Sequence, residues 1–107
     1  MQRLMRRRAS RTVLLCNMVS PEEVDSALHH EIQEECGKWG AVARLVIYHE
    51  RDDDAPAAAR VKIFVQFEDS AQAGAAAAAL NGRYFGGRTV RASLYDQELF
   101  DHGDLTH

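Results

Sequence analysis

Cysteine, proline and tryptophan are scarce in this sequence of 107 residues. The two cysteines, Cys16 and Cys36, lack the spacing of a metal site, so we expect two reduced thiols in a cytosolic or nuclear protein. No segment approaches the roughly 20 apolar residues of a membrane span, and residues 1–11 are too basic for a secretory signal. The chain also lacks a phosphate-binding glycine loop, a nucleophile elbow and a zinc motif. We therefore expect no enzymatic activity, no cofactor, no metal and no membrane partner.

Acidic residues are absent from the first eleven positions and dominate the rest of the chain. The first segment carries five of the 13 basic residues, which leaves 8 basic against 16 acidic residues from Thr12 onward, a net charge of -8. A domain that binds RNA through phosphates should carry a basic face. We therefore divide the chain into a basic N-terminal arm, 1–11, and one acidic folded domain, 12–107, whose charge is poorly suited to RNA.

Two segments have the signatures of helices. Ser20 as N-cap, Pro21 at the first helical position and Glu23 in a capping box predict a helix start, and Gly37 and Gly40 predict its end. Apolar residues recur between them at helical spacing. This stripe comprises Val24, Ala27, Leu28, Ile32, Cys36 and Trp39.

A second helix is expected in the alanine-rich segment that ends at Leu80, with Asp69 or Ser70 as its cap. Strand-like segments cover 13–18, 41–49, 60–67 and 89–94, and a solvated loop covers 51–59. With right-handed crossovers, this β-α-β-β-α-β order predicts an α+β fold with a four-stranded antiparallel sheet and both helices on one face. A short C-terminal helix within 96–104 is expected to lie against the sheet.

The predicted order, with Asn17 ending the first strand and aromatic residues in the third, resembles the RNA recognition motif. In that family RNA bases stack on one aromatic residue of the first strand and two of the third. Here Leu14 and Lys62 occupy two of these positions, and only Phe64 is aromatic. Stacking contributes about 1–3 kcal/mol per base, so most of the usual RNA-binding surface is expected to be lost.

Other residues resemble a protein-binding branch of that family, the UHM or splicing auxiliary factor homology motif. The resemblance covers residue 12 to about 105 and rests on the segment 17–19, an acidic first helix and the Arg83-x-Phe85 signature within 81–88. Segments 36–42 and 95–98 are most similar to the C-terminal UHM of poly-U-binding splicing factors of the Half-pint type. The resemblance implies a nuclear pre-mRNA splicing module that binds short basic, tryptophan-containing motifs of other splicing factors.

The candidate peptide site combines the loop with the first helix. At about 100° per residue, Glu31 and Glu35 fall at the margin of the apolar stripe, where carboxylates need a cationic partner. The resemblance implies that a ligand tryptophan inserts between Phe85 and this helix, while Arg83 pairs with Glu31 or Glu35 and stacks on the ligand ring. Further acids, Asp25 among them, would attract lysines and arginines of the ligand.

Three points stay open at this stage. Tyr84 either packs inward or faces solvent and ranks below its neighbours as a site residue. The chain is alternatively an RNA-binding domain for single-stranded pyrimidine-rich RNA, using Phe64, Lys62 and the basic arm, or a self-association domain that forms a homodimer. The family resemblance also suggests a fragment of a longer protein whose upstream domains bind RNA.

Overall fold

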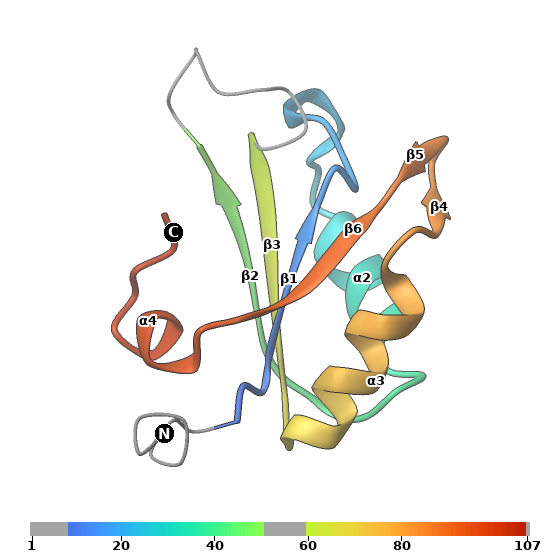
Figure 1. Ribbon diagram of the computed structural model, residues 1–107. Coiled ribbons are helices and arrows are strands. Elements are labelled where there is room, and N and C mark those ends of the chain that lie inside the picture. Colours follow the sequence, from blue (N-terminus) through green and yellow to red (C-terminus); the bar gives the residue numbers. More distant parts are fainter. Residues whose placement is uncertain (1–8, 51–59, 107) are drawn as a thin grey trace.

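A computed structural model describes residues 9–50 and 60–106 of the chain. These residues form a four-stranded sheet with the order β2-β3-β1-β6 and a separate two-stranded hairpin, β4-β5 (Figure 1). The predicted α+β class and the order of its main elements are confirmed. Most of the basic arm and the loop expected at 51–59 lie outside the described residues. In chain order the elements are β1 (Thr12–Cys16), η1 (Pro21–Glu23), α2 (Leu28–Cys36), β2 (Val42–His49), β3 (Val61–Phe67), α3 (Ser70–Leu80), β4 (Tyr84–Phe85), β5 (Arg88–Thr89), β6 (Arg91–Tyr95) and α4 (Gln97–Asp101).

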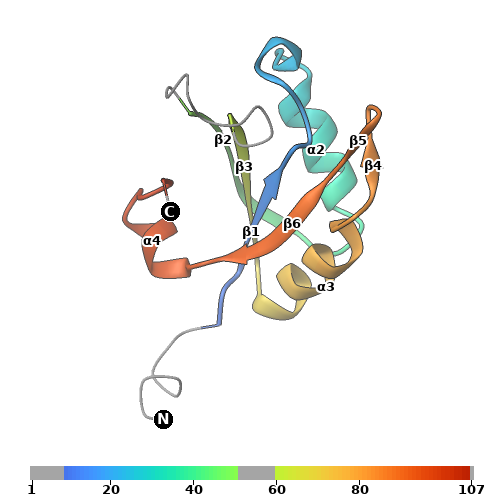
Figure 2. The same cartoon turned by 45° about the horizontal axis from the view of Figure 1, so that its top comes forward.

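The two long helices, α2 and α3, lie on the same face of the sheet (Figure 2). Strand β1 is central and antiparallel to both neighbours, so that Leu15 faces Ile63 of β3 and Ala92 of β6. The order β2-β3-β1-β6 leaves one strand between the two ends of each β-α-β connection, through α2 from β1 to β2 and through α3 from β3 to β6. Within the described ranges, none of the helices has the length and apolar character needed to cross a membrane.

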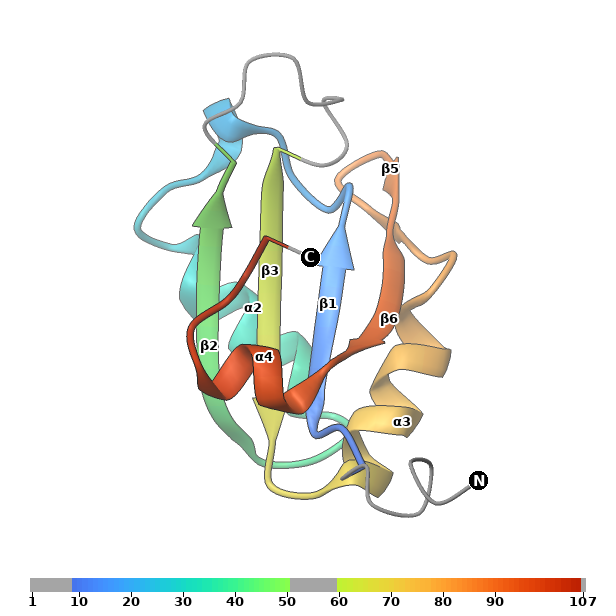
Figure 3. The same ribbon diagram turned by 60° about the vertical axis from the view of Figure 1, so that its left-hand side comes forward.

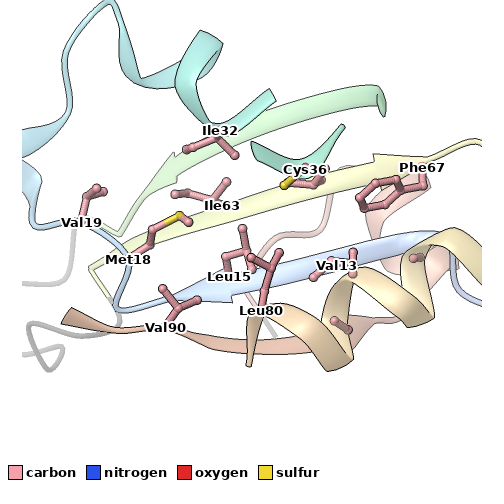
Figure 4. Close-up of a cluster of buried hydrophobic side chains, with 14 of the residues drawn as sticks. Val13, Leu15, Met18, Val19, Ile32, Cys36, Ile63, Phe67, Leu80 and Val90 are labelled. Atoms are coloured by element: carbon pink, nitrogen blue, oxygen red, sulfur yellow. The ribbon is translucent and has the colours of Figure 1, made fainter. Parts of the chain in front are cut away.

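The main core lies between the sheet and these two helices (Figure 4). Alternate residues of the central strands, among them Val13, Leu15 and Ile63, point into it and are fully buried. Helix α2 contributes Ile32, and α3 contributes mainly small alanine side chains, which let the helix approach the sheet closely. The Asp69 carboxylate accepts a hydrogen bond from the N–H of Gln72 at 2.9 Å, which confirms the predicted cap.

The first helix differs in part from the sequence prediction: the start at Ser20, with Pro21 and the Glu23 capping box, is confirmed, but the expected continuous helix was wrong. Residues Pro21–Glu23 form one 3-10 turn, Val24 is extended, and α2 begins only at Leu28. The cause is Asp25, whose carboxylate accepts hydrogen bonds from the N–H groups of Ala27 and Leu28 at 3.0 Å each. Such local side-chain bonds compete with helix formation and favour a new start. Val24 and Trp39 therefore lie outside the helix whose apolar stripe they were assigned to.

The segment before the last strand also differs from the prediction. The strand expected at 89–94 is divided into β5 and β6, and β5 pairs with β4 as a hairpin. Gly86 and Gly87 form its turn with φ of 58° and 82°. Positive φ at both central residues is the signature of a type I′ turn, which matches the twist of a hairpin and favours glycine. The Arg83-x-Phe85 signature thus lies on an ordered hairpin.

The opposite face of the sheet is partly covered by α4, as predicted, and Figure 3 shows this helix crossing the strands. Phe100 of α4 packs against Phe64 of β3, with ring centroids 5.9 Å apart, and Tyr95 meets the same ring at 4.9 Å. Phe64 has 0% of its surface exposed. The aromatic residue that the RNA-binding alternative requires is therefore inaccessible in this arrangement.

We expect Phe100→Ala to lower the free energy of unfolding by about 3 kcal/mol, because a buried ring is replaced by a cavity. Urea unfolding followed by circular dichroism measures this change. Leu94→Ala is the control, since Leu94 is an exposed apolar residue of β6 and should change stability by about 0.5 kcal/mol or less. Equal effects of the two substitutions would contradict the packing of α4 on the sheet.

Candidate functional site

The hairpin that carries Arg83 and Phe85 is closed at its base by backbone hydrogen bonds and joined to the end of β1 by one side-chain hydrogen bond. The N–H of Gly82 donates to the carbonyl of Val90 at 2.8 Å, and the N–H of Val90 donates to the carbonyl of Arg83 at 2.7 Å. Asn17, at the end of β1, donates from Nδ2 to the carbonyl of Thr89 at 2.9 Å. Val90 is buried in the main core. The bonds to Val90 place the base of the hairpin on the main core, and the Asn17 bond holds β5 beside the end of β1.

An additional ion pair joins the hairpin to η1. Arg88 Nε lies 3.2 Å from Glu23 Oε1, and the same oxygen accepts a hydrogen bond from the N–H of Ser20 at 2.8 Å. Sequence reasoning assigned Glu23 only to a capping box and to solvent. It missed this pair because the two residues are 65 positions apart in the chain, and no local pattern indicates such a contact.

A pocket of about 120 Å³ opens between the hairpin and α2. Its floor comes from the main core, where Met18, Leu80 and Val90 lie together (Figure 4). Sites for drug-sized ligands and cofactors usually measure about 300–1,000 Å³, so this pocket is of a size for one side chain. The residues that line it are Met18, Glu35, Leu80, Arg83, Tyr84, Phe85 and Val90.

One rim of the pocket is formed by a carboxylate that two cations share. Arg83 Nη1 lies 3.5 Å from Glu35 Oε2, and Lys38 Nζ lies 3.0 Å from the same oxygen. The side chain of Arg83 is 47% exposed and that of Glu35 is 25% exposed. Ion pairs at such exposure contribute about 0–1 kcal/mol. The pair therefore orients the guanidinium only weakly.

Some of the predicted site residues line this pocket, and others lie outside it. Of the two carboxylates expected beside Arg83, the structure brings Glu35 to it and leaves Glu31 exposed on α2. Phe85 is partly buried and packs on the main core, whereas Tyr84 is 79% exposed. The carboxylate of Asp25 is engaged at the start of α2, a structural role that the sequence pattern did not indicate. Peptide binding by these residues stays a prediction.

Trp39 is the residue near the site that sequence reasoning misplaced. It follows α2 directly, and its ring centroid lies 5.9 Å from Cζ of Arg83. This separation is within the roughly 6 Å at which a cation and an aromatic face attract each other. The sequence gives little sign of this contact, because helical periodicity assigned Trp39 to the apolar stripe of the first helix.

The two cysteines are free, and neither belongs to the pocket. Burial raises the pKa of the Cys36 thiol to about 11, and burial also raises the pKa of the Cys16 thiol. Protonated thiols are poor nucleophiles and poor metal ligands. Among residues 9–50 and 60–106, no group of three or more histidine, cysteine and acidic side chains could hold a metal ion.

The ion pair between Glu23 and Arg88, which anchors the hairpin to η1, depends on pH through the Glu23 carboxyl. The Ser20 N–H, helped by Arg88, holds the pKa of the Glu23 carboxyl below its ordinary value of 4.5. A lowered pKa means that the ionised group stabilises the fold above pH 4.5 and that this stabilisation is lost as pH falls through the lowered value. We therefore expect the Arg88 Nε–H signal in NMR spectra to shift in acid with a midpoint below 4.5.

Glu23→Gln is the matched control for this titration, because it removes the charge and keeps an acceptor. The acid shift of the Arg88 signal should disappear in this variant. If the Arg88 signal titrates equally in the wild type and in Glu23→Gln, a carboxylate other than Glu23 causes the shift.

Comparisons with known proteins agree with this architecture. The sequence profile described as RNA recognition motif matches residues 24–91. The chain is 54% identical over 110 residues to the poly(U)-binding-splicing factor hfp of Drosophila melanogaster, a match that covers 99% of this chain and 17% of that protein. It is 48% identical over 107 residues to the human poly(U)-binding-splicing factor PUF60, covering 99% of this chain and 19% of that protein. The chain thus spans less than a fifth of the length of these relatives.

Solved structures share the fold at lower sequence identity. The RNA15 RRM matches with a TM-score of 0.66 and 20% identity, over 88% of this chain and 99% of that chain. The RRM3 domain of Mip6 matches with a TM-score of 0.64 and 17% identity, over 81% of this chain and 95% of that chain. At such identity, these matches establish the architecture alone.

Proposed function

This chain belongs to the RNA recognition motif family, and we propose that within this family it is a protein-interaction module of a nuclear pre-mRNA splicing factor. Its ligands are short basic motifs with a central tryptophan in other splicing factors. The similarity to poly(U)-binding splicing factors over 99% of the chain supports the place of the domain in splicing. Binding of poly(U) by such a protein then belongs to other domains.

The observation that carries the proposal is the pocket between the hairpin and α2. It has an apolar floor, an aromatic side chain in Phe85 and a guanidinium in Arg83 on its rim. An indole ring inserted there buries apolar surface against Met18, Leu80 and Phe85, which contributes a few kcal/mol. Such a contribution, with a short ligand that must be ordered on binding, corresponds to micromolar affinity.

The charge of the domain suits a basic ligand. Residues 12–107 carry a net charge of -8, and Glu31, Glu34 and Asp25 are exposed on or near α2. Lysines and arginines that precede the ligand tryptophan would meet these carboxylates. Charges on the rim of an interface mainly raise the association rate and select against acidic ligands.

The burial of Phe64 weighs against the RNA-binding alternative. Leu14 and Lys62 replace two of the stacking aromatics of the family, and the third is covered by Phe100 and Tyr95. RNA on the sheet would therefore require α4 to leave its place, and the energy of that step would subtract from the affinity. Self-association remains a separate prediction, which light scattering at several protein concentrations tests.

We expect Phe85→Ala to weaken binding of a short Lys/Arg-rich peptide with one tryptophan by about 30-fold, and Arg83→Ala by about tenfold. Isothermal titration calorimetry measures both affinities. Leu94→Ala, an exposed apolar substitution outside the pocket, should leave the affinity unchanged. Unchanged affinity in the Phe85 and Arg83 variants would reject the assignment of the site.

A parallel NMR titration with oligo-U separates the two functions. Peptide-induced shifts should gather on β4, β5 and α2. If oligo-U binds more tightly than the peptide and shifts Lys62 and its neighbours on β3 instead, the domain is an RNA-binding module.

The role of the acidic residues can be tested without disturbing the fold. Asn is as good a helix cap as Asp, so Asp25→Asn removes the charge and retains the bonds to the N–H groups of Ala27 and Leu28. We expect Asp25→Asn and Glu31→Gln each to slow peptide association by about two- to fivefold at low salt, and less at high salt. Stopped-flow fluorescence measures these rates. Rates that do not change at any salt concentration would remove both residues from the site.

A further inference from the structure

Trp39 is the single tryptophan of the chain and is held at the C-terminal end of α2. Its N–H donates to the carbonyl of Cys36 at 3.1 Å, which continues the helix by one turn. One part of its ring packs against the main core, and the residue remains partly exposed. Trp39 therefore has a fixed backbone, an anchored ring and an accessible aromatic surface.

The accessible surface of Trp39 faces Arg83, with Cζ of the guanidinium 5.9 Å from the ring centroid. Arg83 lines the pocket, whereas Trp39 is absent from the described residues that line it. Arg83 thus takes part in both: its guanidinium lies over the Trp39 ring, and its side chain lines the pocket. A planar guanidinium has two faces, and the face away from Trp39 is available to a ring inserted in the pocket.

Glu35 alone is a poor explanation for the position of Arg83. Its Oε2 atom is approached by Lys38 Nζ at 3.0 Å and by Arg83 Nη1 at 3.5 Å, so the closer cation is Lys38. Both pairs are partly exposed, and exposed pairs contribute little to orientation. A carboxylate oxygen also accepts cations from many directions and does not determine the tilt of the guanidinium plane. The face of Trp39 adds a directional attraction, because a cation is drawn to the face of an aromatic ring and not to its edge.

We infer that Trp39 is a positioning and specificity residue of the proposed peptide site. It orients Arg83 so that the guanidinium is sandwiched between Trp39 and the tryptophan of the ligand. Because the guanidinium is oriented before the ligand arrives, less of its freedom is lost on binding. The sandwich favours flat aromatic side chains over aliphatic ones. This inference rests on the proposed function, since it concerns the same pocket.

The contact itself can be tested without ligand by NMR of ¹⁵N-labelled protein, which contains one indole N–H signal, that of Trp39. Arg83→Ala should shift this signal, because the cation over the ring is removed. Arg91→Ala is the matched control: Arg91 begins β6 and faces Cys16 on β1, away from Trp39. Equal indole shifts in the two variants, or none in either, would overturn the inference.

The role in binding is tested by replacing the aromatic ring. Trp39→Leu retains apolar packing and loses the aromatic face, so we expect the tryptophan peptide to bind about threefold to tenfold more weakly. Trp39→Phe retains the face and should restore affinity to within about twofold of the wild type. For a peptide with leucine in place of tryptophan, Trp39→Leu should change the affinity little, since no sandwich forms.

The outcomes separate this inference from the proposed function. Tight binding by the wild type and equally tight binding by Trp39→Leu would overturn the inference and leave the proposed function intact. Equal losses in Trp39→Leu and Trp39→Phe would also overturn it, because they would reflect packing alone. If the wild type does not bind the tryptophan peptide at all, the proposed function fails and the inference fails with it.

Discussion

The hydrogen bonds between Val90 and the two residues Gly82 and Arg83 close the base of the hairpin and fix the backbone of Arg83 beside the main core. Val90 is buried in the main core, so the backbone that bonds to it cannot move independently of the core. Val90 in the floor of the pocket and Arg83 on its rim therefore belong to one packed unit. Interiors of proteins are close-packed and transmit displacement. A shift of α3, which ends directly before this segment, would therefore move Arg83 as well.

The two faces of the sheet are covered by different elements in this domain. One face carries the main core under α2 and α3, and the other is partly closed by Phe100 and Tyr95 over Phe64. A sheet used for stacking bases must keep its aromatic rings accessible. Here that requirement is not met, and the accessible concave site lies beside the sheet, between the hairpin and α2. The fold is that of the RNA recognition motif family, and the proposed peptide site lies away from the sheet face on which bases stack in that family.

Residue patterns predicted the parts of this structure that depend on local periodicity. The alternation in β3, the alanine-rich helix with its Asp69 cap and the C-terminal helix follow from neighbouring residues. The four-stranded sheet with both helices on one face follows from the usual right-handed crossovers. The late start of α2 was missed because the capping box at Ser20 is formed but opens a single 3-10 turn, and Asp25 then starts α2 separately. The contacts between Arg88 and Glu23, and between Arg83 and Trp39, join distant segments. Such pairs depend on tertiary geometry, which no periodic pattern contains.

Charge and shape contribute to recognition in different ways in this domain. A net charge of -8 over residues 12–107 attracts any basic peptide, and its effect decreases over about 10 Å at moderate salt. It cannot distinguish a tryptophan from a leucine within such a peptide. That choice requires a surface that fits a flat ring, and in the proposed site Phe85 and Arg83, with Trp39 beside the guanidinium, would supply it. Lysine at position 83 would retain the charge but have no planar face. In the proposed peptide site, the planarity of the guanidinium, rather than its charge, would therefore make Arg83 suited to select a tryptophan.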